Sequence, residues 1–303
     1  MGGRQLAPGW HAARANDLIT TTHTLGAART FLFVPGNRPE RFTKALASGA
    51  EAVIIDLEDA VAPADKDSAR EQLRLAFSQI GLVERSRLLV RINASGTAWE
   101  DADLQLMQEL AKQGLAGVLP AKTESVSALA RVASVVGPSC ALLPLIESVA
   151  GLDQVNALAA APQVLRLVFG HLDFQADVGL ACDSSEAELV PVRLALVLAT
   201  RRAGIASAVD GVTLAISDSV QLQNDSSRSR RAGFGAKLCI HPAQVALVNT
   251  AFAPSTAEID WALRVTANAE AAAGGVVKLD GRMVDAPVVL LAQRTLARVR
   301  NPL

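Results

Sequence analysis

The chain contains no tyrosine, only three cysteines and few aromatic residues. Cys140, Cys182 and Cys239 are odd in number and show no C-x-x-C spacing, which argues against a disulfide framework and against a structural zinc site. This cysteine usage favours a reducing, cytoplasmic setting. No uninterrupted run of about 18 apolar residues occurs, so the sequence predicts no membrane-spanning helix.

The chain also lacks a surplus of charge of either sign, because it contains 29 Lys and Arg residues and 30 Asp and Glu residues. The chain therefore lacks the overall positive field that holds nucleic acid or an anionic membrane. Its first residues have no apolar stretch of the secretory kind. Residues 1–28 are expected to form a tail or a partner-binding arm, with an organelle-targeting peptide as the alternative.

Two common motifs are absent. Without a G-x-S-x-G elbow, the sequence offers no candidate for acyl-enzyme chemistry. The turn after the first expected strand reads Pro35-Gly36-Asn37-Arg38-Pro39 rather than G-x-G-x-x-G, which disfavours a doubly wound nucleotide-binding sheet.

What the sequence does contain is a regular alternation of short apolar runs and amphipathic stretches, which is typical of repeated βα units. Strands are expected at 30–35, 52–57, 87–93, 116–121, 141–147, 164–170, 206–213 and 236–240. Helices are expected at 39–49, 65–80, 99–113, 123–135, 149–160, 185–203, 218–232 and 242–252. Eight such units predict a (β/α)8 barrel, an α/β fold, over 29–253.

The pattern changes after Pro254. A long helix at 256–273, a strand at 276–279, an Asp280-Gly281 turn, a second short strand and a helix from Ala286 to about Arg298 are expected there. Asp-Gly between apolar runs is a strong hairpin signal. We therefore predict that 254–303 forms a C-terminal extension or lid.

Two expected strands each end in one carboxylate, Glu147 and Asp173. The carboxyl ends of barrel strands are where chemistry takes place, and two neighbouring carboxylates there suit Mg²⁺. The structural alternative is that Glu147 caps the next helix and Asp173 forms a turn.

Arg91 ends the third expected strand, where it would either clamp a substrate carboxylate or form a buried structural ion pair. Asp56 and Glu58 follow the second strand and point to the same side. We expect these two acids to act behind the metal ligands, on metal-bound water or on Arg91, because further direct ligands would overcharge the site.

Three cations and one amide lie near the same edge. Asn37, Arg38 and Lys44 follow the first strand at an expected helix start, where phosphate binds well, and Lys122 follows the fourth strand. A solvated helix face is the alternative for the first three. The run Arg228, Arg230 and Arg231 is expected to be a solvated face, and Asp285 to be an N-cap. His241 is expected to be a structural cap, with a general acid or base as the alternative.

Six ordered motifs together resemble the citrate lyase beta-subunit-like, malyl-CoA lyase-like branch of the HpcH/HpaI aldolase superfamily. They cover about 29–300 and comprise Phe31-Leu32-Phe33-Val34-Pro35-Gly36-Asn37-Arg38-Pro39-Glu40-Arg41-Phe42, Asp56-Leu57-Glu58-Asp59-Ala60-Val61 with Lys66 and Ala69-Arg70, Arg91-Ile92-Asn93, Leu145-Ile146-Glu147-Ser148, Gly233-Phe234-Gly235-Ala236-Lys237 with Ile240-His241-Pro242-Ala243-Gln244, and Met283-Val284-Asp285-Ala286-Pro287-Val288-Val289.

The resemblance implies a barrel that uses Mg²⁺, or Mn²⁺, to cleave or form a C–C bond in a malyl-, citramalyl- or citryl-type CoA thioester. It implies that Glu147 and Asp173 are metal ligands and that Arg91 binds the keto-acid end of the substrate. It also implies that Asp285 is an acid that reaches a neighbouring subunit's site in a homotrimer or hexamer. Thioester hydrolysis, or a beta subunit that depends on an acyl carrier, are the alternatives. We assign Asn37, Arg38, Lys44 and Lys122 to CoA binding.

One motif departs from the family. Where relatives often read Gly-x-Glu-Asp-Phe, this chain reads Gly170-His171-Leu172-Asp173-Phe174. The expected ligand Asp173 is kept, whereas Leu172 replaces an acid and His171 adds bulk. The substrate is therefore expected to differ from that of the better-known members.

Overall fold

The computed structural model describes residues 24–271 and 277–299. The chain divides into two compact units, Met1–Val248 and Asn249–Leu303, which are described separately. In the described ranges no helix is long and apolar enough to cross a membrane.

The first unit is built on parallel strands. They are β1 Thr30–Pro35, β2 Ala52–Asp56, β3 Leu88–Ile92, β4 Gly117–Pro120, β5 Ala141–Leu142, β6 Leu145–Ile146, β7 Val168–Phe169, β8 Val209–Asp210 and β9 Ala236–Cys239. Their order in the sheet is β5-β4-β3-β2-β1-β9-β8-β7-β6. Each strand coincides with a stretch predicted from the apolar runs, although β7 and β8 are shorter than expected.

The sheet closes on itself at Pro144. β5 and β6 stand at opposite ends of the strand order, yet they are consecutive pieces of the segment 141–146. The Leu143 amide donates to the Val118 carbonyl at 3.0 Å, and the Val168 amide donates to the Pro144 carbonyl at 3.1 Å. One interrupted strand therefore joins both edges, and the predicted (β/α)8 barrel is confirmed.

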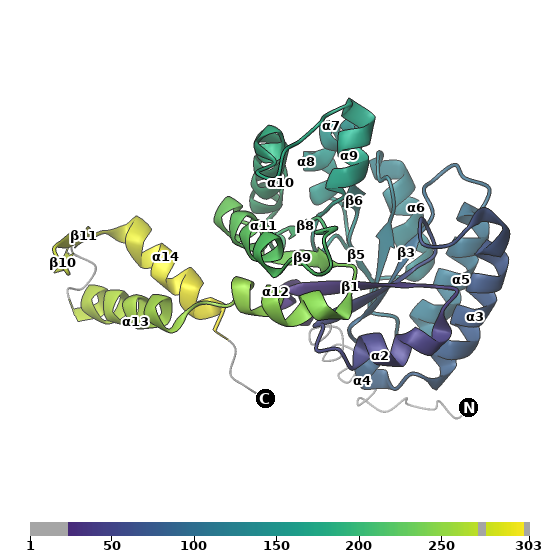
Figure 1. Ribbon diagram of the computed structural model, residues 1–303, viewed down its shortest axis with the longest axis horizontal. Helices are drawn as coiled ribbons and strands as arrows, with labels where there is room; N and C mark the ends of the chain where they lie inside the picture. Colours follow the sequence, from purple (N-terminus) through teal and green to yellow (C-terminus); the bar gives the residue numbers. More distant parts are fainter. Residues whose placement is uncertain (1–23, 272–276, 300–303) are drawn as a thin grey trace, which may run out of the picture. The chain divides into compact units, whose positions relative to one another are not determined.

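Helices cover the outside of the curled sheet (Figure 1). The helices and 3-10 turns (η) are η1 Pro39–Arg41, α2 Phe42–Leu46, η2 Pro63–Asp65, α3 Lys66–Gln79, α4 Leu82–Arg85, α5 Glu100–Lys112, α6 Val126–Val136, α7 Val149–Asp153, α8 Val155–Ala159, α9 His171–Val178, η3 Ala187–Leu189, α10 Val190–Ala203, α11 Ser219–Ala232, η4 Pro242–Gln244 and α12 Val245–Phe252.

Several helical predictions need correction. The helix expected at 39–49 is a 3-10 turn followed by the five-residue α2, and the helix expected at 149–160 is split at Gln154 into α7 and α8. α9 was not predicted, because its sequence directly follows a strand and reads as a turn. This short helix carries Asp173 in its first turn.

The barrel core also includes residues that the sequence placed in the N-terminal tail. Leu25 and Ala28 are fully buried in the same apolar cluster as Phe31 and Leu145. The buried Arg166 donates from Nη1 to the carbonyls of Leu25 at 3.1 Å and Ala28 at 2.6 Å. These carbonyls are therefore paired inside the barrel, whereas the rest of the expected tail, residues 1–23, lies outside the described residues.

The second unit contains α13 Thr256–Ala271, β10 Val277–Leu279, β11 Arg282–Val284 and α14 Ala286–Ala297. β10 and β11 pair antiparallel across Asp280 and Gly281, both of which have positive φ. The predicted Asp-Gly hairpin is thus confirmed, whereas residues 272–276, including the start of the first expected strand, lie outside the described residues.

Candidate metal and substrate site at the barrel mouth

Acidic and basic side chains from five strand ends meet at one end of the barrel. Asp56 ends β2, Arg91 lies opposite it in β3, Lys122 follows β4, Glu147 follows β6, and Asp173 lies just after β7. Four of them, all except Lys122, line a cavity of about 390 Å³. Its remaining wall is largely apolar and includes Phe33, Leu145, Phe169, Val212, Leu238 and Ile240.

Glu147 is, like Asp56, a deeply buried acid of this cavity wall. It is 3% exposed, and its Oε1 accepts from the Lys122 amide at 2.7 Å. Burial, together with the charges of Asp173 and Glu58, raises the pKa of Glu147 to about 8. A Cβ atom added at Gly170 would lie 2.3 Å from Glu147 Oε2, so the absence of a side chain there makes room for the carboxylate.

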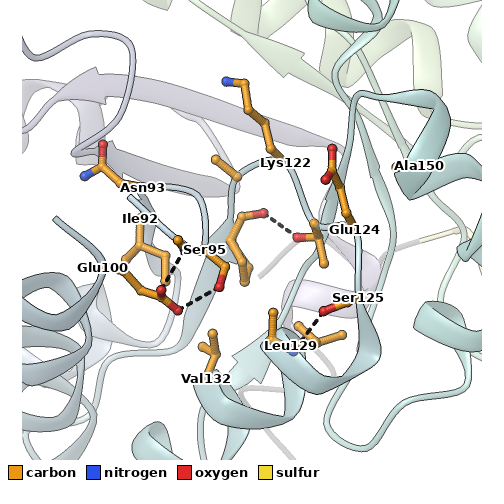
Figure 2. A pocket seen from close by; sticks show the side chains of 15 residues that line it. Ile92, Asn93, Ser95, Glu100, Lys122, Glu124, Ser125, Leu129, Val132 and Ala150 are labelled. Atoms are coloured by element: carbon orange, nitrogen blue, oxygen red, sulfur yellow. Dashed lines mark hydrogen bonds between the residues drawn. The ribbon is translucent and has the colours of Figure 1, made fainter. Parts of the chain in front are cut away.

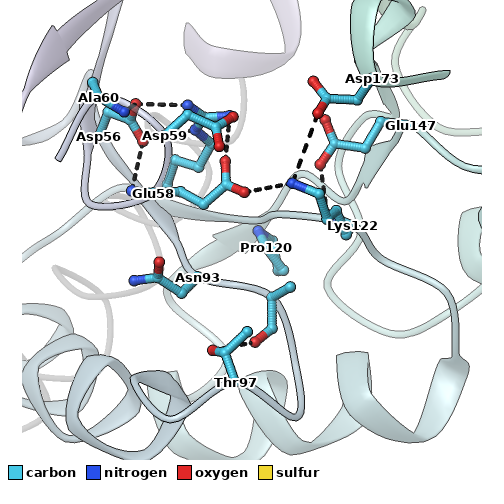
Figure 3. Close-up of polar contacts among 12 residues, drawn as sticks. Asp56, Glu58, Asp59, Ala60, Asn93, Thr97, Pro120, Lys122, Glu147 and Asp173 are labelled. Carbon is cyan, nitrogen blue, oxygen red and sulfur yellow. Dashed lines mark hydrogen bonds and ion pairs between the residues drawn. The ribbon is translucent and has the colours of Figure 1, made fainter. Parts of the chain in front are cut away.

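Asp173 is more open, with a side chain that is 41% exposed. Its Oδ1 lies 3.8 Å from Lys122 Nζ. Figure 3 shows Glu147 and Asp173 next to each other on the same side of Lys122. The structural alternative for Glu147, a helix cap, does not hold, because Ser148 caps α7 by accepting from the Gly151 amide.

Arg91 is held by three acids of the segment that begins with the last residue of β2. Its Nε and Nη2 bind the two oxygens of Asp56 at 2.7 and 2.6 Å, and its Nη1 lies 2.7 Å from Glu58 and 3.3 Å from Asp59. Although burial opposes the charged form, Asp56 and Glu58 raise the pKa of Arg91, so the guanidinium stays charged. Asp59 was missed as a partner of Arg91 in the sequence.

A second layer of buried polar groups holds that segment in place. Lys66 Nζ donates to the carbonyls of Leu57 at 2.7 Å and Glu58 at 2.8 Å, and to Asn93 Oδ1 at 2.7 Å. Asn93 in turn donates to Asp103, whose other oxygen accepts from Arg70 at 2.8 Å. The motif residues Lys66 and Arg70 thus gain a structural explanation that the sequence did not offer.

The arrangement fits a divalent cation. Glu147 and Asp173 offer hard carboxylate oxygens, and a cation between them would offset both the burial and the repulsion that raise the pKa of Glu147. Within the described ranges no group of three or more His, Cys, Asp or Glu side chains could hold a metal ion. Two carboxylate ligands from the protein are typical of Mg²⁺ sites that water and substrate oxygens complete.

The residues that we assigned to CoA lie in different settings. Arg38 and Lys44 are exposed near the start of α2, and Arg38 Nε binds Glu40 at 2.6 Å. Asn37 is partly buried beside them. The Lys122 side chain instead contacts an acid of the site, with its Nζ 2.6 Å from Glu58 Oε1.

Beside Lys122 lies a second cavity, of about 450 Å³, between the segments after β3 and β4 and the helix α6 (Figure 2). Leu129 and Val132 form part of an apolar wall, and Asn93 and Glu100 are among its polar residues. Both carboxylate oxygens of Glu100 already accept hydrogen bonds, from the Ser95 hydroxyl and the Gly96 amide.

Two other expectations concern helix starts. Asp285 is the N-cap of α14, where its Oδ1 accepts from the Val288 amide at 3.3 Å, and its catalytic role stays a prediction. The His241 imidazole accepts from the Ala243 amide, so the expected cap is confirmed. The solvated face expected around Arg228 is wrong for that residue, which binds Glu186 at 2.9 Å and Asp225 at 3.0 Å.

Fold and site together define a (β/α)8 barrel enzyme with an acidic mouth that contains one arginine. More narrowly, residues 29–242 match the HpcH/HpaI aldolase/citrate lyase family, and the chain belongs to this family. The resemblance seen in the six motifs is thereby confirmed.

Relatives extend the similarity over most of the chain. A (3S)-malyl-CoA thioesterase of Cereibacter sphaeroides is 33% identical over 91% of this chain and 96% of its own length. A citrate lyase subunit beta-like protein of Mycobacterium tuberculosis is 35% identical over 88% and 94%. The crystal structure of CitE from M. tuberculosis in complex with magnesium, acetoacetate and coenzyme A is similar with a TM-score of 0.76, 34% identity, and coverage of 90% of this chain and 98% of that one.

Proposed function

We propose that this protein is a Mg²⁺-dependent lyase that cleaves, or forms, the C–C bond of a 3-hydroxyacyl-CoA of the malyl, citramalyl or citryl type. The products of cleavage would be an acyl-CoA and a 2-keto acid. The observation that carries the proposal is the convergence of Glu147, Asp173 and Arg91 on one cavity. A relative that binds magnesium, acetoacetate and coenzyme A together supports it.

In this proposal Glu147 and Asp173 hold Mg²⁺, which acts as a Lewis acid toward substrate oxygens when bound. Arg91 contributes a fixed positive charge beside the oxygen on which negative charge develops. Asp56 takes two of its five N–H donors, and Glu58 and Asp59 lie against a third nitrogen. The guanidinium is thereby preorganised and would share its remaining donors with the substrate carboxylate.

The proton step is proposed for Asp285. Its protonated carboxyl group would donate a proton to the carbon of the departing acyl-CoA, and its carboxylate would remove that proton in the condensation direction. We expect it to act on the site of a neighbouring copy in a homotrimer or hexamer. The 3.3 Å bond from the Val288 amide would fix its orientation at the start of α14.

CoA recognition is proposed for the exposed cations after β1. Arg38, Lys44 and the Asn37 amide would bind phosphate groups of CoA, and an acyl-carrier arm would present similar chemistry in a lyase complex. Lys122 fits this role less well, because its ammonium contacts Glu58.

Thioester hydrolysis is the second candidate. It is favoured by the 33% identity to a (3S)-malyl-CoA thioesterase over 91% of this chain. The same metal site would then bind an attacking water, and the products would be a free hydroxy acid and CoA.

The deciding experiment is a panel of malyl-, methylmalyl-, citramalyl- and citryl-CoA, assayed with Mg²⁺ and with EDTA. Keto acid formed without an equal amount of free thiol supports the lyase, whereas free thiol without keto acid supports the thioesterase. Glu147→Gln keeps the side-chain shape and is expected to abolish either activity. Full activity in EDTA, or in this variant, would remove the metal from the proposal.

A further inference from the structure

Lys122 lies among the acids of the site, and within the described residues it is the one lysine whose ammonium lies against their carboxylates. Its Nζ is 2.6 Å from Glu58 Oε1 and 3.8 Å from Asp173 Oδ1 (Figure 3). Its backbone amide donates to Glu147 Oε1 at 2.7 Å. One residue therefore contacts both expected metal ligands and the acid that supports Arg91.

The backbone of Lys122 is unusual. Its φ is +42°, in the left-handed region that side chains other than glycine seldom adopt. This conformation aims the amide at Glu147 while the side chain turns to Glu58. Strain of this kind persists where the surrounding contacts demand it, and it is concentrated at functional sites.

We propose that Lys122 is the built-in counter-charge of the metal site, which weakens Mg²⁺ binding and strengthens binding of the anionic substrate. The inference rests on the metal site of the proposed function. An ammonium group 3.8 Å from Asp173 repels a divalent cation on that carboxylate and attracts a 2-keto acid bound beside it. Lys122 would thus set the balance between the two ligands.

Opposite effects on the two ligands separate this role from a purely structural one. In Lys122→Met the backbone amide and its bond to Glu147 are kept while the charge is lost. We expect Mg²⁺ to bind about two- to fivefold more tightly, and pyruvate to bind the Mg²⁺-saturated protein more weakly by a similar factor. Isothermal titration calorimetry of the full-length protein measures both, without any turnover.

Two control variants test whether the effect comes from the charge at position 122. Lys112→Met removes the same charge from the exposed end of α5 and is expected to change neither affinity. Lys122→Arg keeps the charge and is expected to bind Mg²⁺ no more tightly than the wild type.

A second variant keeps the test valid if Lys122→Met folds poorly. Glu58→Gln leaves Lys122 in place but removes its 2.6 Å partner, so the ammonium moves its charge toward Asp173. Mg²⁺ is then expected to bind more weakly than in the wild type.

Equal or weaker Mg²⁺ binding by a folded Lys122→Met variant would overturn the counter-charge role and leave the metal site standing. Unchanged or tighter Mg²⁺ binding by Glu58→Gln would also overturn it. If the wild-type protein bound no Mg²⁺, the metal site of the proposed function would fail, and this inference with it.

Discussion

Gly170 lies between β7 and α9, directly against the Glu147 carboxylate. Even the smallest side chain at this position would meet Glu147 Oε2 at 2.3 Å and its Cβ at 2.6 Å. The Glu147 carboxylate can therefore occupy its position only because Gly170 has no side chain. The sequence showed only that a glycine ends an apolar run, which by itself predicts a turn.

Gly170→Ala is expected to displace Glu147 and to weaken Mg²⁺ binding by at least about tenfold, as for other residues that orient a metal ligand. Titration calorimetry measures the affinity, and circular dichroism checks the fold. Gly26→Ala is the matched control, because its added Cβ would meet other atoms only at 3.6 Å or beyond. Wild-type Mg²⁺ affinity in Gly170→Ala would show that Glu147 does not need this space.

At the scale of elements, the segment after β2 is held by α3 and by the end of β3. Lys66 from α3 is 5% exposed and gives all three of its donors to this region. Because Asp56, Glu58 and Asp59 all contact Arg91, α3 helps to fix the position of the Arg91 side chain through this segment. We regard Lys66 as a positioning residue.

Lys66→Met removes three hydrogen bonds: the carbonyls of Leu57 and Glu58 keep only their bonds from Asn93 Nδ2 and the Val61 amide, and Asn93 Oδ1 loses its lysine donor. We expect the free energy of unfolding to fall by about 2–4 kcal/mol. Pyruvate affinity should fall as well because Arg91 loses its alignment, while Mg²⁺ affinity stays unchanged. Urea unfolding and titration calorimetry measure these effects, and an equal loss of Mg²⁺ and pyruvate binding would indicate a general collapse of the site instead.

The elements predicted best were those whose signal is local. Apolar runs bounded by small residues predicted the strands, and Asp280-Gly281 predicted the hairpin, because both signals lie within a few residues. α9 was missed because eight residues after a strand carry too little helical periodicity. Arg228 was misread because its partner Glu186 is 42 residues away in the sequence.

The sequence predicted which residues gather at the site, but it did not predict all of their contacts. Strand ends converge in any barrel, so Glu147, Asp173 and Arg91 were expected to lie near each other, and the structure brings them to one cavity. What spacing does not contain is the direction of long side chains. The contact of Lys122 with Glu58 and the hydrogen bonds of Lys66 therefore became visible only in the structure.

At the scale of the whole molecule, the barrel contains a buried charge cluster on the side opposite β2 and β3 in the strand order. Asp210 at the end of β8 is fully buried, with Arg193 Nε at 3.1 Å and Ser229 as a further donor. Burial disfavours the ionised form of Asp210, but Arg193 and Lys237 more than offset this and lower its pKa.

A depressed carboxylate pKa stabilises the fold above the unfolded-state pKa, and this contribution disappears as the pH falls through the folded-state pKa. Asp210→Asn should therefore be less stable than the wild type by about 3–5 kcal/mol at pH 7. The difference should shrink as the pH is lowered from 5 toward 3. Urea unfolding across this range measures it, and a constant difference would exclude ionised Asp210 as the cause.

Asp285 gives a prediction about assembly. If Asp285 acts on a neighbouring copy, Asp285→Asn and Glu147→Gln are each inactive, yet mixed oligomers contain some sites with both acids intact. Mixing the two variants under conditions of subunit exchange should restore activity with malyl-CoA or whichever thioester the wild type cleaves. Mixtures that stay inactive after verified exchange would place Asp285 outside the neighbour's site.

The bonds from Arg166 to the carbonyls of Leu25 and Ala28 span 141 and 138 residues of sequence. During synthesis these carbonyls cannot reach their partner until more than half of the 303 residues have been made. Contacts of such long range are slow to form and leave strand edges exposed meanwhile. We therefore expect the region before β1 to be among the last parts of the barrel to become protected from hydrogen exchange during refolding, well after the pairing of β1 with β2.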